Sequence, residues 1–171
     1  MPQVVARAWV PVEPPLAFAV SQTQGDVRMR WDPFIRRQRL VGAARPGKGV
    51  QTITRTRLGL GMVSEYASYR PPTSVGMTML RGPWFLERFG GGWRFSPERR
   101  DGVDGTEASW KYTYTVRPAW LRPIAEPIGQ WLLGREIRAR IAAFAAACDD
   151  AVVLDAARTD LARDERERPV S

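Results

Sequence analysis

Residues 107–116, EASWKYTYTV, alternate almost without exception between polar and apolar side chains. Because a β-strand places successive side chains on opposite sides, this segment predicts a strand with one polar and one aromatic face. A sheet with such a face must cover it, either with a closed core or with the wall of a ligand cavity. The aromatic face carries Ala108, Trp110, Tyr112, Tyr114 and Val116.

The absence of histidine narrows the chemistry open to this chain of 171 residues. It excludes a Ser-His-Asp triad, a Cys-His pair and a metal site with imidazole ligands. No clustered Asp/Glu motif such as a calcium loop is present either. We therefore assign no catalytic residue, no metal site and no cofactor. The single cysteine, Cys148, excludes an intramolecular disulfide and favours a cytoplasmic location, and the sequence shows neither a secretion signal nor an apolar run of roughly 18 residues.

The net charge of +8 is concentrated near the start of the chain. Residues 1–57 hold ten basic and three acidic side chains, and nearly all the basic residues of the protein are arginines. This excess fits either an ordinary solvated surface or an anionic partner, such as a lipid surface or an acidic protein. Nucleic acid is not expected, because no nucleic-acid-binding motif accompanies the charge. The oligomeric state is not predicted.

The order of the elements indicates an α+β domain. Apolar alternation and Gly/Pro turns predict an antiparallel succession of strands, with two short helices after the first strand and a long helical segment over 119–154. Gly90–Gly92 is interpreted as a bulge or bend within or between strands. We expect one domain over residues 1–150, followed by a charged helix extension or disordered tail over 151–171. The predicted strands are 3–10, 34–41, 50–58, 62–69, 74–80, 84–89, 93–95 and 107–116.

The long helical segment is the only large amphipathic element available to cover the sheet. Its apolar residues recur at steps of three and four, which places them on one face. Because this helix has to cover the apolar face of the sheet, we expect a curved antiparallel sheet of about six or seven strands wrapped around it. Trp120 and Trp131 are expected to dock the helix. The buried face is expected to contain Leu133, Ile137, Ile141, Phe144 and Cys148.

Several short motifs occur in the order typical of one superfamily. They are VVARAWVPVEPPLAFAV at 4–20, WDPF at 31–34, YRPP at 69–72 and RGPWFLERFGGGWRFSPE at 81–98, before the helix around Phe144. Over residues 3–150 the chain resembles the START-like or SRPBCC superfamily, which includes polyketide cyclases/dehydratases, lipid-transfer domains and birch-pollen-allergen-like proteins. The resemblance implies the helix-grip fold with a cavity between sheet and helix.

Twelve residues are candidates for ligand binding, although each also suits an ordinary core. In the strand at 62–69 the inward face is undecided: Tyr66 is the candidate for a pocket hydroxyl and Glu65 its alternative. Arg55 or Arg88 is considered as an inward partner for a ligand carboxylate. The twelve are Trp31, Phe34, Tyr66, Met77, Met79, Trp93, Phe95, Trp110, Tyr112, Tyr114, Ile137 and Ile141.

Three functions remain open at this point. The first is noncatalytic binding of a hydrophobic small molecule such as a lipid, isoprenoid or polyketide-like aromatic, for transport or sensing. The second is a polyketide cyclase, aromatase or dehydratase that uses cavity tyrosines as acids or hydrogen-bond donors. The third is a module that docks onto a membrane or protein through the basic first third of the chain.

Overall fold

A computed structural model gives the structure of residues 1–167. The strands are β1 (Gln3–Val10), β2 (Ile35–Val41), β3 (Gln51–Thr56), β4 (Gly61–Arg70), β5 (Ser74–Arg81), β6 (Leu86–Arg100) and β7 (Val103–Val116). The helices are α1 (Pro14–Gln22), α2 (Gly25–Trp31), the 3-10 turn η1 (Ala119–Leu121), α3 (Arg122–Ala147) and α4 (Ala151–Glu167).

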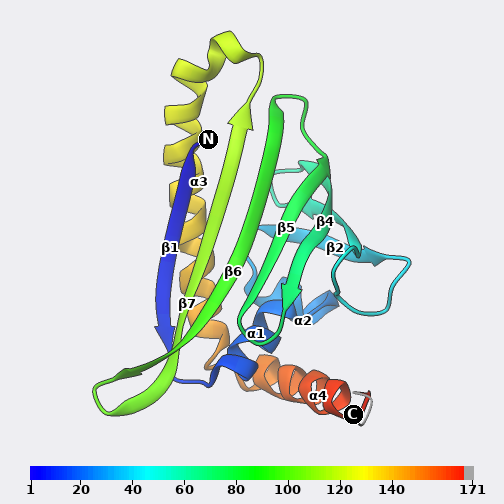
Figure 1. Ribbon diagram of the computed structural model, residues 1–171, viewed down its shortest axis with the longest axis vertical. Helices are drawn as coiled ribbons and strands as arrows, with labels where there is room; N and C mark the ends of the chain where they lie inside the picture. Colours follow the sequence, from blue (N-terminus) through cyan, green and yellow to red (C-terminus); the bar gives the residue numbers. More distant parts are fainter. Residues whose placement is uncertain (168–171) are drawn as a thin grey trace.

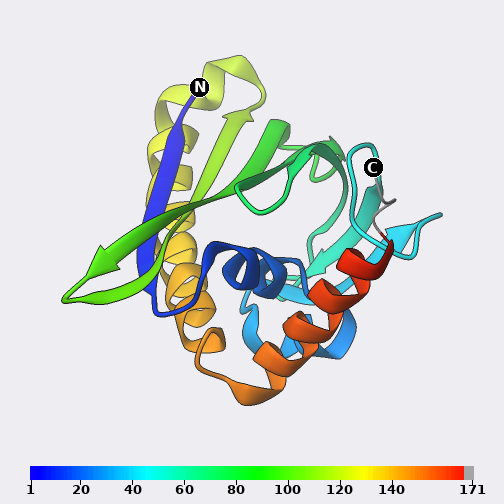
Figure 2. The same ribbon diagram turned by 60° about the horizontal axis from the view of Figure 1, so that its bottom comes forward.

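The seven strands form one antiparallel sheet in the order β1-β7-β6-β5-β4-β3-β2. Strands β2 to β7 follow one another as a meander. The last strand, β7, pairs with β1, which forms one edge of the sheet and places Ala6 opposite Trp110. The sheet curls so strongly that β1 and the β2–β3 pair lie on opposite sides of the molecule (Figures 1 and 2).

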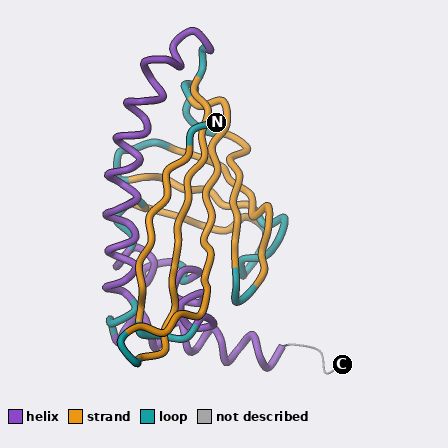
Figure 3. The backbone as a smooth tube through the Cα atoms, turned by 60° about the vertical axis from the view of Figure 1, so that its left-hand side comes forward, coloured by secondary structure: helices purple, strands orange, loops and turns teal. Residues whose placement is uncertain are grey.

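Helix α3 lies along the inner side of this sheet, next to β1 and β7 (Figure 3). The predicted face of the helix is confirmed, because Ile137, Ile141 and Phe144 are buried. The ring of Phe144 is 4.6 Å from that of Trp93 on β6 and 5.9 Å from that of Trp31 on α2, measured between centroids. The α+β helix-grip fold predicted from the sequence is therefore the fold observed.

The predicted continuous helix over 119–154 is wrong at one point, where the chain turns after Ala147. The carboxylate of Asp150 accepts hydrogen bonds from the backbone N–H groups of Val152 and Val153 and so begins a separate helix, α4. This helix lies across α1 and buries Val153 and Ala157 (Figure 2). A tail over 168–171 lies outside the described residues.

Two further expectations need correction. For Gly90–Gly92 the bulge and the break between two strands are wrong, because the three glycines pair in unbroken register with both neighbours inside the single strand β6. Their role is close packing: a Cβ on Gly91 would lie 3.0 Å from the Trp110 ring and 3.2 Å from that of Tyr112. Trp120 and Trp131 do not dock the helix, since their side chains are exposed on its outer side.

Candidate functional site

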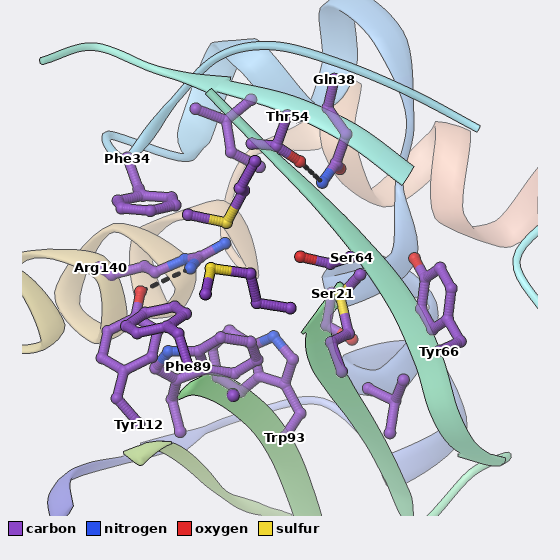
Figure 4. A pocket seen from close by; sticks show the side chains of 18 of the residues that line it. Ser21, Phe34, Gln38, Thr54, Ser64, Tyr66, Phe89, Trp93, Tyr112 and Arg140 are labelled. Carbon is purple, nitrogen blue, oxygen red and sulfur yellow. Dashed lines mark hydrogen bonds between the residues drawn. The ribbon is translucent and has the colours of Figure 1, made fainter. Parts of the chain in front are cut away.

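A pocket of about 60 Å³ lies between the inner faces of the strands β2 to β7 and the side chain of Arg140 on α3. One water needs roughly 10–15 Å³ by this measure, so the space holds a few waters. Figure 4 shows Phe34, Arg140 and Tyr112 on one side of the pocket, and Ser64 and Tyr66 on the other. The lining is mainly aromatic and thioether, with Phe34, Met62, Met77, Met79, Phe89, Trp93 and Trp110.

Seven of the twelve sequence candidates line this pocket: Phe34, Tyr66, Met77, Met79, Trp93, Trp110 and Tyr112. The other five do not line it. Of these, Trp31 donates a hydrogen bond to Thr23 and packs on Phe144, and Phe95 lies between Phe18 and Phe144. Tyr114 donates to the backbone oxygen of Glu126 at 2.6 Å, and Ile137 and Ile141 belong to the core between α3 and the sheet. A ligand-binding role for the seven stays a prediction.

The structure decides the orientation of β4. Met62, Ser64 and Tyr66 face the pocket, whereas Glu65 lies on the other face. Burial raises the pKa of the Tyr66 phenol, so this group stays a neutral hydroxyl. The two arginines considered as inward groups, Arg55 and Arg88, are both exposed.

Two other arginines are buried, and both bind Asp32 at the end of α2. Arg140 donates from Nη2 to Oδ2 of Asp32 at 2.6 Å, and Arg28 donates from Nε to the same oxygen at 2.9 Å. Arg28 also donates to the backbone oxygen of Ser21, and Asp32 accepts from the backbone of Phe34. Burial alone would raise the pKa of Asp32, but the charges of Arg140 and Arg28 outweigh it and lower that pKa. The carboxylate is therefore ionised and fully enclosed.

Tyr112 connects this cluster to a second carboxylate. Its hydroxyl accepts a hydrogen bond from Nη1 of Arg140 at 2.7 Å and donates to Oε1 of Glu136 at 2.9 Å. Burial raises the pKa of Tyr112, and it also raises the pKa of Glu136, with Arg140 acting in the opposite direction. The phenol thus stays protonated and is held in place from two sides.

Three donors beside the pocket have no hydrogen-bond partner among residues 1–167. They are the indole N–H groups of Trp93 and Trp110 and the Nε–H of Arg140. The guanidinium of Arg140 lies 4.6 Å from the centroid of the Trp110 ring, and the two indole rings lie 4.6 Å apart. A buried donor without an acceptor costs about 1–3 kcal/mol. The pocket therefore combines an apolar wall with unused hydrogen-bonding capacity.

The sequence reasoning missed Asp32 and Arg140. A signal for Arg140 was present, because it lies three residues after Ile137 and four before Phe144, on the face predicted to be buried. A charged residue on such a face needs a charged partner inside the protein. No local pattern identifies Asp32 as that partner, since it lies 108 residues away in the chain.

The fold and the interior site define a helix-grip protein with a buried charge cluster beside a small, largely aromatic pocket. Residues 1–149 match the family described as polyketide cyclase / dehydrase and lipid transport, and the chain belongs to this family. The START-like resemblance seen in the sequence is thereby confirmed. No curated protein matches the chain by sequence.

Solved structures share the fold at low identity. A START superfamily protein from Mycobacterium smegmatis has a TM-score of 0.68 at 12% identity, covering 86% of this chain and 97% of that one. The allergen Ara h 8.0201 gives 0.54 at 16% identity, with 85% and 98% covered. The di-domain ARO/CYC protein BexL from the BE-7585A biosynthetic pathway gives 0.63 at 16%, with 84% of this chain and 48% of that chain covered.

Across residues 1–167, no helix combines the length and the apolar character needed to cross a bilayer.

Proposed function

We propose that the protein binds a hydrophobic small molecule that carries at least one acceptor oxygen, in the pocket between the sheet and α3. The observation that carries the proposal is the set of unpaired donors on Trp93, Trp110 and Arg140 beside a largely aromatic and thioether wall. A carbonyl, hydroxyl or carboxylate oxygen of a lipid, isoprenoid or polyketide-like aromatic would accept from them. The free, buried thiol of Cys148 agrees with action in the cytoplasm.

The ligand must enlarge the pocket to enter it. Pockets for drug-sized ligands occupy about 300–1,000 Å³, whereas the free space here is about 60 Å³. Met62, Met77 and Met79 are the side chains suited to give way, because methionine has three rotatable bonds and repacks at low cost. Burial of the apolar part of the ligand then contributes about 25 cal/mol per Å².

The contact between Tyr112 and Glu136 favours a second candidate function, a polyketide cyclase or dehydratase. A carboxylate within hydrogen-bond distance of a pocket tyrosine supplies a proton acceptor beside a proton donor. Tyr112 would turn its O–H from Glu136 to the carbonyl oxygen of a substrate and polarise that carbonyl by hydrogen bonding. The family description and the ARO/CYC label of BexL agree with this candidate.

Native mass spectrometry of freshly purified protein, followed by denaturation and analysis of the organic extract, tests binding. We expect a discrete excess mass that is lost on denaturation and whose extract contains an oxygen-bearing apolar compound. The absence of any excess mass, together with no thermal stabilisation by fatty acids, fatty alcohols or aromatic polyketides, would contradict the proposal.

A pair of variants tests the role of the unpaired donors. Trp110→Phe removes the indole N–H from the pocket, whereas Trp9→Phe removes one that donates to Glu98 outside it. The loss of one hydrogen bond, about 0.5–1.5 kcal/mol, weakens binding by up to about tenfold. We expect this loss for Trp110→Phe alone, measured by titration with the extracted compound. If the wild type instead turns over a poly-β-keto substrate and Glu136→Gln abolishes that turnover, the second candidate function, the cyclase, is established.

A further inference from the structure

The outer face of the first half of α3 is apolar and uncovered. Ile124, Ile128, Trp131 and Leu132 of α3 continue at helical spacing from Trp120 of η1, and the exposed fractions of the five run from 53% to 77%. The opposite face of the same turns is already packed, because Gly129 lies directly against Tyr114 of β7. The exposed side chains therefore have no part in closing the fold.

The loop between β5 and β6 brings a third exposed tryptophan to the same end of the molecule. Trp84 is 74% exposed, and its backbone oxygen accepts a hydrogen bond from Nε of Arg117 at 2.5 Å. The backbone N–H of Arg117 donates to Phe85 at 3.0 Å. The loop and the start of α3 therefore lie side by side, at the end of the molecule far from α4 (Figure 1). We call this surface, with Trp84, Trp120, Ile124, Ile128, Trp131 and Leu132, the aromatic end.

The segments that form the aromatic end carry a net positive charge. The segments 81–88 and 117–135 contain Arg81, Arg88, Arg117, Arg122 and Arg135 against Glu87 and Glu126, a net charge of +5 − 2 = +3. Glu87 is already paired with Arg122 at 2.5 Å. Surfaces that lie in the interface of a bilayer combine exposed tryptophan and isoleucine with arginines in this way.

We propose that the aromatic end docks this protein onto an anionic lipid bilayer. The tryptophan and isoleucine side chains enter the interfacial region, and the arginines bind lipid phosphates. Charge decides against a second copy as the occupant, since a twofold pairing of this surface would place +3 against +3. The surface differs from the basic first third of the chain that the sequence suggested, and it does not depend on the proposed ligand.

Co-sedimentation with vesicles tests the proposal, using phosphatidylcholine alone or mixed with phosphatidylglycerol. We expect binding to the mixed vesicles only, and weaker binding as salt is raised. The triple variant Trp84→Ala/Trp120→Ala/Trp131→Ala should bind at least about tenfold more weakly. Arg88→Gln/Arg135→Gln, which changes two exposed arginines, should weaken binding by about tenfold or more.

The matched control is Arg36→Gln/Arg37→Gln/Arg39→Gln on β2, three exposed arginines of the basic first third. It should retain binding within about threefold, because these residues lie outside the aromatic end. Circular dichroism checks that every variant keeps the fold. The proposal is overturned if the wild type ignores the mixed vesicles, or if the β2 variant loses binding while the tryptophan variant keeps it. It is also overturned if the aromatic end instead forms dimers in lipid-free solution that the tryptophan variant abolishes.

Discussion

The two halves of α3 have the same apolar periodicity and opposite surroundings. In the second half, Ile137, Ile141 and Phe144 are buried against the sheet, and Arg140 enters the interior beside them. In the first half, Ile124 and Ile128 are more than half exposed. The comparison shows that an amphipathic pattern defines a face of a helix without defining what covers that face.

The difference follows from which side chains face the sheet. In the second half, the apolar face points inward, and its aromatic and aliphatic groups fill the space beneath β6 and β7. In the first half, Gly129 takes the inward position and permits close approach to Tyr114, so the large residues lie on the outer side. One half of the helix therefore stabilises the fold, and the other is free to meet a partner.

We expect the largest difference in the free energy of unfolding between a variant at a buried residue of α3 and a variant at an exposed one. Phe144→Ala leaves a cavity beneath Trp93 and should reduce the free energy of unfolding by about 3–5 kcal/mol. Ile128→Ala, on the outer face of the first half, should change it by less than about 0.5 kcal/mol. Urea unfolding at neutral pH measures both. Equal losses would show that the first half is covered in solution.

Neutralising Asp32 tests the charge cluster below the second half of the helix. Asp32→Asn leaves two buried guanidinium groups without their anion and should cost about 3 kcal/mol at neutral pH. Asp160→Asn, an exposed control on α4, should have little effect.

The effect of Asp32→Asn should depend on pH. Because the pKa of Asp32 is lower in the folded protein than its usual value of about 3.9, its ionised form stabilises the fold above that pH. This contribution is lost as the pH falls through the lower, folded-state pKa. The stability difference between wild type and Asp32→Asn should therefore be largest near neutrality and shrink below about pH 4. A difference that is independent of pH would mean that folding does not change the pKa of Asp32.

A smaller effect distinguishes the two tyrosines of β7. The Tyr112 hydroxyl joins two charged groups in the second half of the helix, whereas that of Tyr114 donates to one backbone oxygen in the first half. Hydrogen bonds to charged groups contribute about 1.5–3 kcal/mol, against about 1 kcal/mol for neutral ones. Tyr112→Phe should thus destabilise the protein more than Tyr114→Phe in thermal or urea unfolding. The reverse order would mean that the Tyr112–Glu136 contact adds nothing to stability.

The sheet and its inner face could be predicted because strand geometry is local. The alternation in 107–116 assigned Trp110, Tyr112 and Tyr114 to one side, and all three are buried there. The aromatic face of this strand serves both as cavity wall and as core, since Trp110 and Tyr112 line the pocket whereas Tyr114 packs against α3. No pattern within one strand separates these cases, because the separation depends on where the helix passes over the sheet.

Residue order and side-chain periodicity alone determined the helix-grip architecture, the amphipathic face of the closing helix and most of the aromatic wall. Tertiary structure alone decided that Asp32 meets Arg28 and Arg140, that Arg55 and Arg88 stay in solvent, and that Trp120 and Trp131 lie uncovered. Periodicity is a property of neighbouring residues, which any strand or helix expresses by itself. The pairing of charges from distant segments, and the covering of one half of a helix but not the other, exist only once the chain has folded.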